Sequence, residues 1–169
     1  MVEKNTGKRS RQIALAALFA ALYAIGVTVL APISFQAYQV RVADCLLPLS
    51  ILFGPPAILG LTLGTFVGNL SSPFGAIDIV GGALANLLAT FLAWQIGKRK
   101  FNGSWLVATI CEVLVITFVV GTYLSYLLAI PVWLGWTGVL VGEIIAVNIG
   151  GYLLLNGVFR TFGRRSIQS

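Results

Sequence analysis

The sequence predicts an all-α, polytopic membrane protein: one domain, built as a compact bundle of six transmembrane helices. Of its 169 residues, 58% are hydrophobic and 9% are charged, which is more apolar surface than a soluble domain of this length can bury. In lipid only helices or a closed barrel can satisfy the backbone hydrogen bonds. The long uncharged runs lack the alternation of barrel strands, which favours helices.

Three basic clusters at the ends of apolar segments predict the topology. Lysine and arginine are enriched in cytoplasmic loops, so an even number of helices should separate successive clusters, and both termini should be cytoplasmic. The clusters consist of Lys4, Lys8, Arg9 and Arg11, then Lys98, Arg99 and Lys100, then Arg160, Arg164 and Arg165.

Taken in order, the six predicted helices cover residues 12–31, 42–53, 56–70, 76–97, 104–128 and 137–160. Residues 45–77 carry no charge and are too many for one crossing of about 30 Å. The turn Gly54-Pro55-Pro56 divides this run into two short helices, and Pro131 divides the last two helices. The outer ends of the short pair should lie below the membrane surface, forming a cup that the loop 32–42 could cover.

Composition also excludes several classes of function. The net charge is +6, but no basic face suited to nucleic acid is present. The chain has no histidine, which excludes histidine-based catalysis and the usual zinc sites. It has no phosphate-binding loop ending in Lys-Ser or Lys-Thr. Cys45 and Cys111 are interpreted as small buried hydrophobes. We expect no enzyme activity, no catalytic residue, no metal and no cofactor.

Isolated polar side chains in the apolar segments are the candidate substrate site. A charge near hydrocarbon costs about 2.5–3.5 kcal/mol, so such groups are usually paired or functional. Phe35 belongs to a set of aromatic residues at the predicted outer ends, which could be interfacial or could stack on a planar ligand. The predicted substrate-binding residues are Phe35, Gln39, Arg41, Asp44, Asn69, Asp78, Glu112 and Glu143; Asn86 and Asn148 are isolated polar residues of the same kind.

The carboxylates have structural alternatives. Glu143, about a turn and a half into the last helix, must face a cavity, a donor or a ligand, or else pair with Arg41. Asp78 opens the fourth predicted helix and could stabilise its N-terminus. Glu112 could be protonated and structural, or a second contact to the ligand.

Small residues recur at four-residue spacing in several helices. Such rows let helices approach closely in lipid, and most are interpreted as internal packing. The first helix is different, because Ala16, Ala20 and Ala24 adjoin a second row, Ala17 and Ala21. This broad face predicts docking of a partner protein.

The chain resembles the QueT family. The resemblance rests on residues 31–35 (APISF), 39–44 (QVRVAD), 60–64 (GLTLG), 69–75 (NLSSPFG) with Asp78, and 141–143 (VGE). It implies a cell-membrane S component of an energy-coupling-factor transporter, which imports a queuosine precursor, a deazaguanine base. It also implies an outward-facing site, and docking of the first helix onto a transmembrane coupling protein with two ATPase subunits.

Two positions depart from the family pattern, Asp44 in place of glutamate and Glu112 where asparagine is usual. An uncompensated carboxylate such as Glu112 would suit a cationic aminomethyl group on the base. Two other hypotheses stay open: an S component for another vitamin-like heteroaromatic compound, and a membrane assembly subunit that transports nothing.

Overall fold

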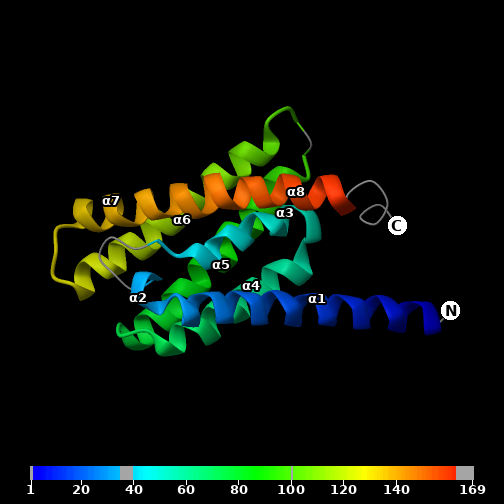
Figure 1. Ribbon diagram of the computed structural model, residues 1–169, viewed down its shortest axis with the longest axis horizontal. Coiled ribbons are helices and arrows are strands. Elements are labelled where there is room, and N and C mark those ends of the chain that lie inside the picture. Colours follow the sequence, from blue (N-terminus) through cyan, green and yellow to red (C-terminus); the bar gives the residue numbers. More distant parts are fainter. Residues whose placement is uncertain (1, 35–39, 100, 163–169) are drawn as a thin grey trace.

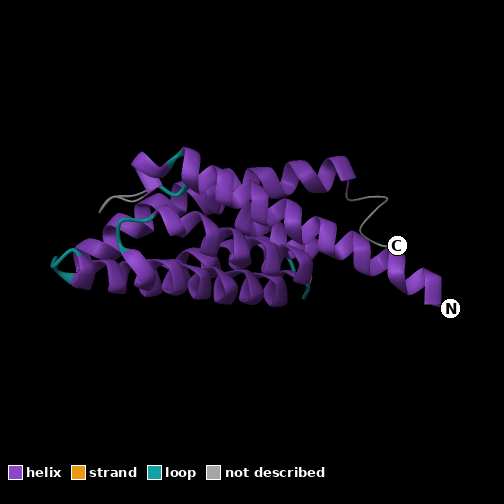
Figure 2. Cartoon of the chain, turned by 90° about the horizontal axis from the view of Figure 1, so that it is seen from below, coloured by secondary structure: helices purple, strands orange, loops and turns teal. Residues whose placement is uncertain are grey.

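The computed structural model describes residues 2–34, 40–99 and 101–162. Within these residues every regular element is a helix, which confirms the predicted all-α class. Figure 1 shows the helices running along one common direction, and Figure 2 shows the first turns of α1 extending beyond the rest of the bundle. Four stretches are long and apolar enough to cross a membrane: Gly7–Val29, Gly75–Gly97, Ser104–Leu127 and Val132–Thr161.

The first helix, α1 (Val2–Val29), begins well before the predicted start at residue 12. A single turn, α2 (Ala31–Ser34), follows it. The buried side chains of α1 recur every four residues, at Phe19, Tyr23 and Val27, and they set the face that α1 turns toward the bundle.

The second and third segments form the predicted short pair. The second consists of the 3₁₀ helix η1 (Val42–Leu49) and one turn of α-helix, α3 (Ser50–Phe53). The third consists of α4 (Pro55–Gly68) and the turn η2 (Asn69–Ser71). At 14 residues, α4 is only about 21 Å long, which is shorter than the hydrocarbon layer of about 30 Å.

Gly54 makes the sharp reversal between α3 and α4. Its φ angle of 61° lies in the left-handed region, which glycine reaches without steric cost. Pro55 then occupies the first position of α4, where a missing N–H costs nothing. The predicted turn is therefore confirmed.

The remaining helices are long. They are α5 (Gly75–Gly97), α6 (Ser104–Leu127) and a continuous last segment made of α7 (Val132–Glu143), the π-helical η3 (Ile144–Gly151) and α8 (Tyr152–Phe162). The last segment begins directly after Pro131, five residues before the predicted start at 137. The described residues thus form six helical segments.

A close helix contact joins α1 to α4 in parallel. A Cβ atom added to Gly60 would lie 2.4 Å from the Ala16 carbonyl oxygen, and one added to Gly64 would lie 2.7 Å from the Ala20 carbonyl oxygen. The absence of side chains at both glycines therefore lets the two backbones touch. The start of α1 and the end of α8 lie at the same end of the bundle (Figure 1); that this end faces the cytoplasm stays a prediction.

Candidate functional site

Polar side chains from all six segments meet inside the bundle. We call them the polar cluster. All but Tyr123 are at most 3% exposed, although the surrounding core is apolar. The polar cluster consists of Tyr23, Arg41, Asp44, Thr65, Asn69, Asp78, Asn86, Glu112, Tyr123 and Glu143.

Asp78 is the anchor of one half of the cluster. It lies in the first turn of α5, and its Oδ1 atom is 3.9 Å from Nη2 of Arg41. The Tyr123 hydroxyl of α6 donates a hydrogen bond of 2.5 Å to the same oxygen. The Asn69 amide donates to the Asp78 carbonyl oxygen at 2.9 Å. Asp78 is thus a carboxylate at the N-terminus of α5, and it also forms an ion pair with Arg41.

A chain of hydrogen bonds forms the other half and reaches α1. The Tyr23 hydroxyl donates to Oδ1 of Asp44. The Asn86 amide of α5 donates to the Tyr23 hydroxyl at 2.8 Å and to the Thr65 hydroxyl of α4 at 2.7 Å. Because all of these atoms are buried, each bond lies in a medium of low dielectric constant, where it is strengthened.

Asp44, Glu112 and Glu143 converge at the centre of the cluster. Asp44 lies close enough to both glutamates to interact with them electrostatically, and Arg41 lies close enough to interact with Glu143. Both oxygens of Glu112, Oε2 of Glu143 and Oδ2 of Asp44 are buried without a hydrogen-bond partner. Within the described residues no group of acidic or cysteine side chains has the arrangement of a metal site.

The charge of the cluster is unbalanced. Four carboxylates, those of Asp44, Asp78, Glu112 and Glu143, surround one guanidinium, that of Arg41. If all are ionised, three negative charges are left over. A buried carboxylate is costly unless it is protonated or meets a cation, so the cluster is suited to a ligand that brings positive charge and hydrogen-bond donors.

The structure brings together six of the eight predicted substrate-binding residues. Phe35 and Gln39 lie outside the described residues. Asn148, another isolated polar residue, is half-buried and its Oδ1 atom has no partner.

Sequence reasoning missed Tyr23 and Thr65. It identified Asn86, and it included Tyr123 in the set of aromatic residues at the outer ends, without assigning either to the site. Tyr23 could have been found from the sequence. It lies between Phe19 and Val27 in a row of side chains spaced four residues apart, and it is the one member of these three that has a polar group. A hydroxyl in such a row needs a partner inside the protein.

The alanine face of α1 is divided between packing and exposure. Ala16, Ala20 and Ala24 are half-buried, and the first two pack against α4. Ala17 and Ala21 are exposed. Docking of a partner on this helix stays a prediction.

A helical bundle with four stretches long and apolar enough to cross a membrane, and with charged groups held in its interior, has the features of a membrane transport protein. The model of the QueT transporter family matches residues 13–160, and the chain belongs to this family. No curated protein and no solved structure matched the chain. Membership indicates a transport function, and since the family is one of transporters, the prediction that the chain is not an enzyme is confirmed.

Proposed function

We propose that this protein is the substrate-binding S component of an energy-coupling-factor importer in the cell membrane, and that its substrate is a queuosine precursor. The base would be a deazaguanine that carries a cationic aminomethyl group. The proposal rests on membership of the QueT transporter family and on one observation of the site, the excess of buried carboxylates over Arg41.

Electrostatics favours a cationic substrate over a neutral one. Glu112 has two buried oxygens without a partner and Glu143 has one, so both can accept hydrogen bonds from a ligand. A hydrogen bond with a charged partner contributes about 1.5–3 kcal/mol, which corresponds to roughly 10- to 150-fold in affinity. The ring donors of a deazaguanine would use the remaining acceptors, such as the free oxygens of Asp44 and Asn69.

Thermal unfolding of the purified protein tests the choice of substrate. A ligand at a hundred times its Kd adds about 2.7 kcal/mol to the free energy of unfolding. We expect the aminomethyl deazaguanine to stabilise the protein more than the nitrile analogue, which has the same ring and no positive charge. Stabilisation by flavin, biotin or thiamine instead would favour an S component for another heteroaromatic compound.

Neutral variants test the site. Glu112→Gln and Glu143→Gln should each weaken binding of the aminomethyl base by roughly 10- to 150-fold, the range of one charged hydrogen bond. Thr117→Val is the matched control, because Thr117 is a buried polar residue of the same helix as Glu112 and carries no charge. Unchanged binding by both glutamine variants would remove the site assignment.

We propose further that α1 docks onto a transmembrane coupling protein that carries two ATPase subunits. The sequence has no phosphate-binding loop of its own, and small exposed residues such as Ala17 and Ala21 allow close helix approach. Co-purification with these subunits should be lost in Ala17→Trp and kept in Leu84→Trp, a control on the exposed face of α5. Equal retention of the subunits by both variants would argue for a membrane subunit that works without them, or for docking elsewhere.

A further inference from the structure

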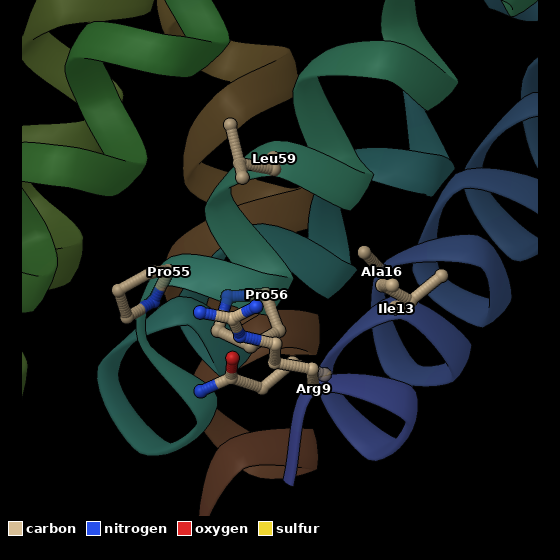
Figure 3. Close-up of a pocket in the computed structure, with 7 residues that line it drawn as sticks. Arg9, Ile13, Ala16, Pro55, Pro56 and Leu59 are labelled. Carbon is tan, nitrogen blue, oxygen red and sulfur yellow. The ribbon is translucent and has the colours of Figure 1, made fainter. Parts of the chain in front are cut away.

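A groove separates the first turns of α1 from the start of α4. It encloses about 280 Å³ and is lined by Arg9, Gln12, Ile13, Pro55, Pro56 and Leu59, among others. Figure 3 shows the Arg9 side chain reaching from α1 across to Pro56. The groove lies at the end of the bundle opposite the loops that follow α4 and α6, so it is distinct from the polar cluster.

The end of the bundle that holds the groove is positively charged. Exposed basic side chains come from α1, from the end of α5 and from α8: Lys8, Arg9, Arg11, Lys98, Arg99 and Arg160. Four acidic side chains fall within the part of the chain whose burial is described, and all four belong to the polar cluster. Among the residues whose burial is described, this end of the bundle therefore exposes basic side chains and no acidic one.

A second cation approaches the turn from which α4 begins. The ammonium group of Lys98 lies 4.3 Å from the centre of the Trp94 ring. That ring contacts Gly54, because a Cβ added to Gly54 would lie 3.0 Å from Nε1 of Trp94. Lys98 and Arg9 thus both lie near this turn, and the positive end of the α4 helix dipole lies there too.

The walls of the groove lead onto apolar surface. Ile13 is 70% exposed and Leu59 is 56% exposed, and Leu63 continues the same face one turn along α4. A compound that fits must combine an anionic group, for Arg9 and Gln12, with a hydrocarbon chain, for Ile13 and Leu59. An acidic protein segment would match the charge but not the apolar exit. One wall of that exit, Ile13, belongs to the stretch Gly7–Val29, which is long and apolar enough to cross a membrane.

We propose that this groove binds one anionic phospholipid, with its phosphate at Arg9 and an acyl chain along Ile13 and Leu59. Ligand pockets usually measure about 300–1,000 Å³. The groove therefore holds the headgroup and the first part of a chain, and the remainder of the lipid lies on the outer surface of α1 and α4.

Native mass spectrometry of the purified protein with added lipid tests this site. Phosphatidylglycerol should remain bound at a stoichiometry of one, and phosphatidylcholine with the same chains should not. Arg9→Gln should weaken phosphatidylglycerol binding about fivefold, the effect expected for one basic residue near an anionic headgroup. Arg99→Gln is the matched control, since it removes an exposed arginine from the same end of the bundle but outside the groove.

A second variant tests the shape of the site. Leu59→Trp should fill the groove and weaken binding while leaving the charge intact, and the exposure of Leu59 makes folding of the variant secure. The proposal fails if phosphatidylcholine binds equally well, if Arg9→Gln and Arg99→Gln weaken binding to the same extent, or if Leu59→Trp binds normally. It also fails if glycerol phosphate, which has no chains, competes fully for the site.

Discussion

Replacing Gly60 with alanine tests the contact on which the placement of α1 depends. The added Cβ would lie 2.4 Å from the Ala16 carbonyl oxygen and 2.8 Å from Cβ of Phe19. Comfortable contacts between such atoms are about 3.5–4.0 Å, so α1 and α4 must separate by roughly 1 Å. Both clashing atoms belong to or adjoin the backbone, and no side-chain rotation relieves the overlap.

The expected cost follows from overpacking, which is typically about 1–3 kcal/mol. For a chain of this size each kcal/mol lowers the Tm by about 2–4 °C, so Gly60→Ala should unfold roughly 2–12 °C below the parent protein in the same detergent. Gly157→Ala in α8 is the matched control. Nothing lies within 4 Å of its added Cβ, and alanine is favoured over glycine in a helix by about 0.5–1 kcal/mol.

The two variants should therefore shift the Tm in opposite directions, and thermal unfolding measured by circular dichroism would show it. If Gly60→Ala proved as stable as Gly157→Ala, the close backbone contact between α1 and α4 would be wrong.

Three further variants address the polar cluster. Tyr23→Phe leaves Asp44 without its donor and should cost about 1–3 kcal/mol of stability, read as a lower unfolding temperature; an unchanged one would contradict the hydrogen bond. Gly151→Ala places a Cβ 2.8 Å from Cγ of Pro48, so it should push η3 from η1 and weaken substrate binding in isothermal titration, whereas normal affinity would show that η1 tolerates the shift. Glu112→Gln replaces a buried carboxyl group whose two oxygens have no hydrogen-bond partner, so it should raise the unfolding temperature of the free protein while reducing its rise on adding substrate; a lower unfolding temperature without substrate would mean that the carboxyl group is satisfied.

The helices were largely predictable because lipid permits few solutions. A run without charge, divided at Gly54 and Pro55, allows little other than a short helical pair, and the structure has one. The boundaries were less predictable. In the structure the last segment begins at Val132, directly after Pro131. Proline is common at the start of helices but also ends them, so Pro131 alone did not fix where the segment begins.

The irregular helices could not be predicted. η1 contains Pro48, which has no N–H for an α-helical hydrogen bond, but a proline does not by itself specify a 3₁₀ helix. η3 is a π-helix; Glu143, which immediately precedes it, and Val147 and Gly151 within it are buried. Spacing in the sequence is compatible with an ordinary α-helix there, so only tertiary contacts with η1 distinguish the two.

The polar cluster was predictable where a charge stands alone in an apolar run, as Glu112 and Glu143 do. The tyrosines were harder to assign. Tyr23 was missed, and Tyr123 was interpreted as one of the aromatic residues at the outer ends, because such residues are usually interfacial. Which carboxylate pairs with Arg41 also required the structure, since Asp78 is distant from Arg41 in the sequence.

One helix belongs to both the interior and the perimeter of this protein. α1 is a continuous rod of 28 residues; it carries the Tyr23 hydroxyl to Asp44 and turns Ala17 and Ala21 outward. A continuous helix tilts as one unit. If a partner docks on the outer face of α1 as proposed and tilts the helix, the Tyr23 hydroxyl that donates to Asp44 moves with it. Because coupling between two binding equilibria is reciprocal, substrate binding that displaces this hydroxyl would then change the affinity of α1 for the proposed partner.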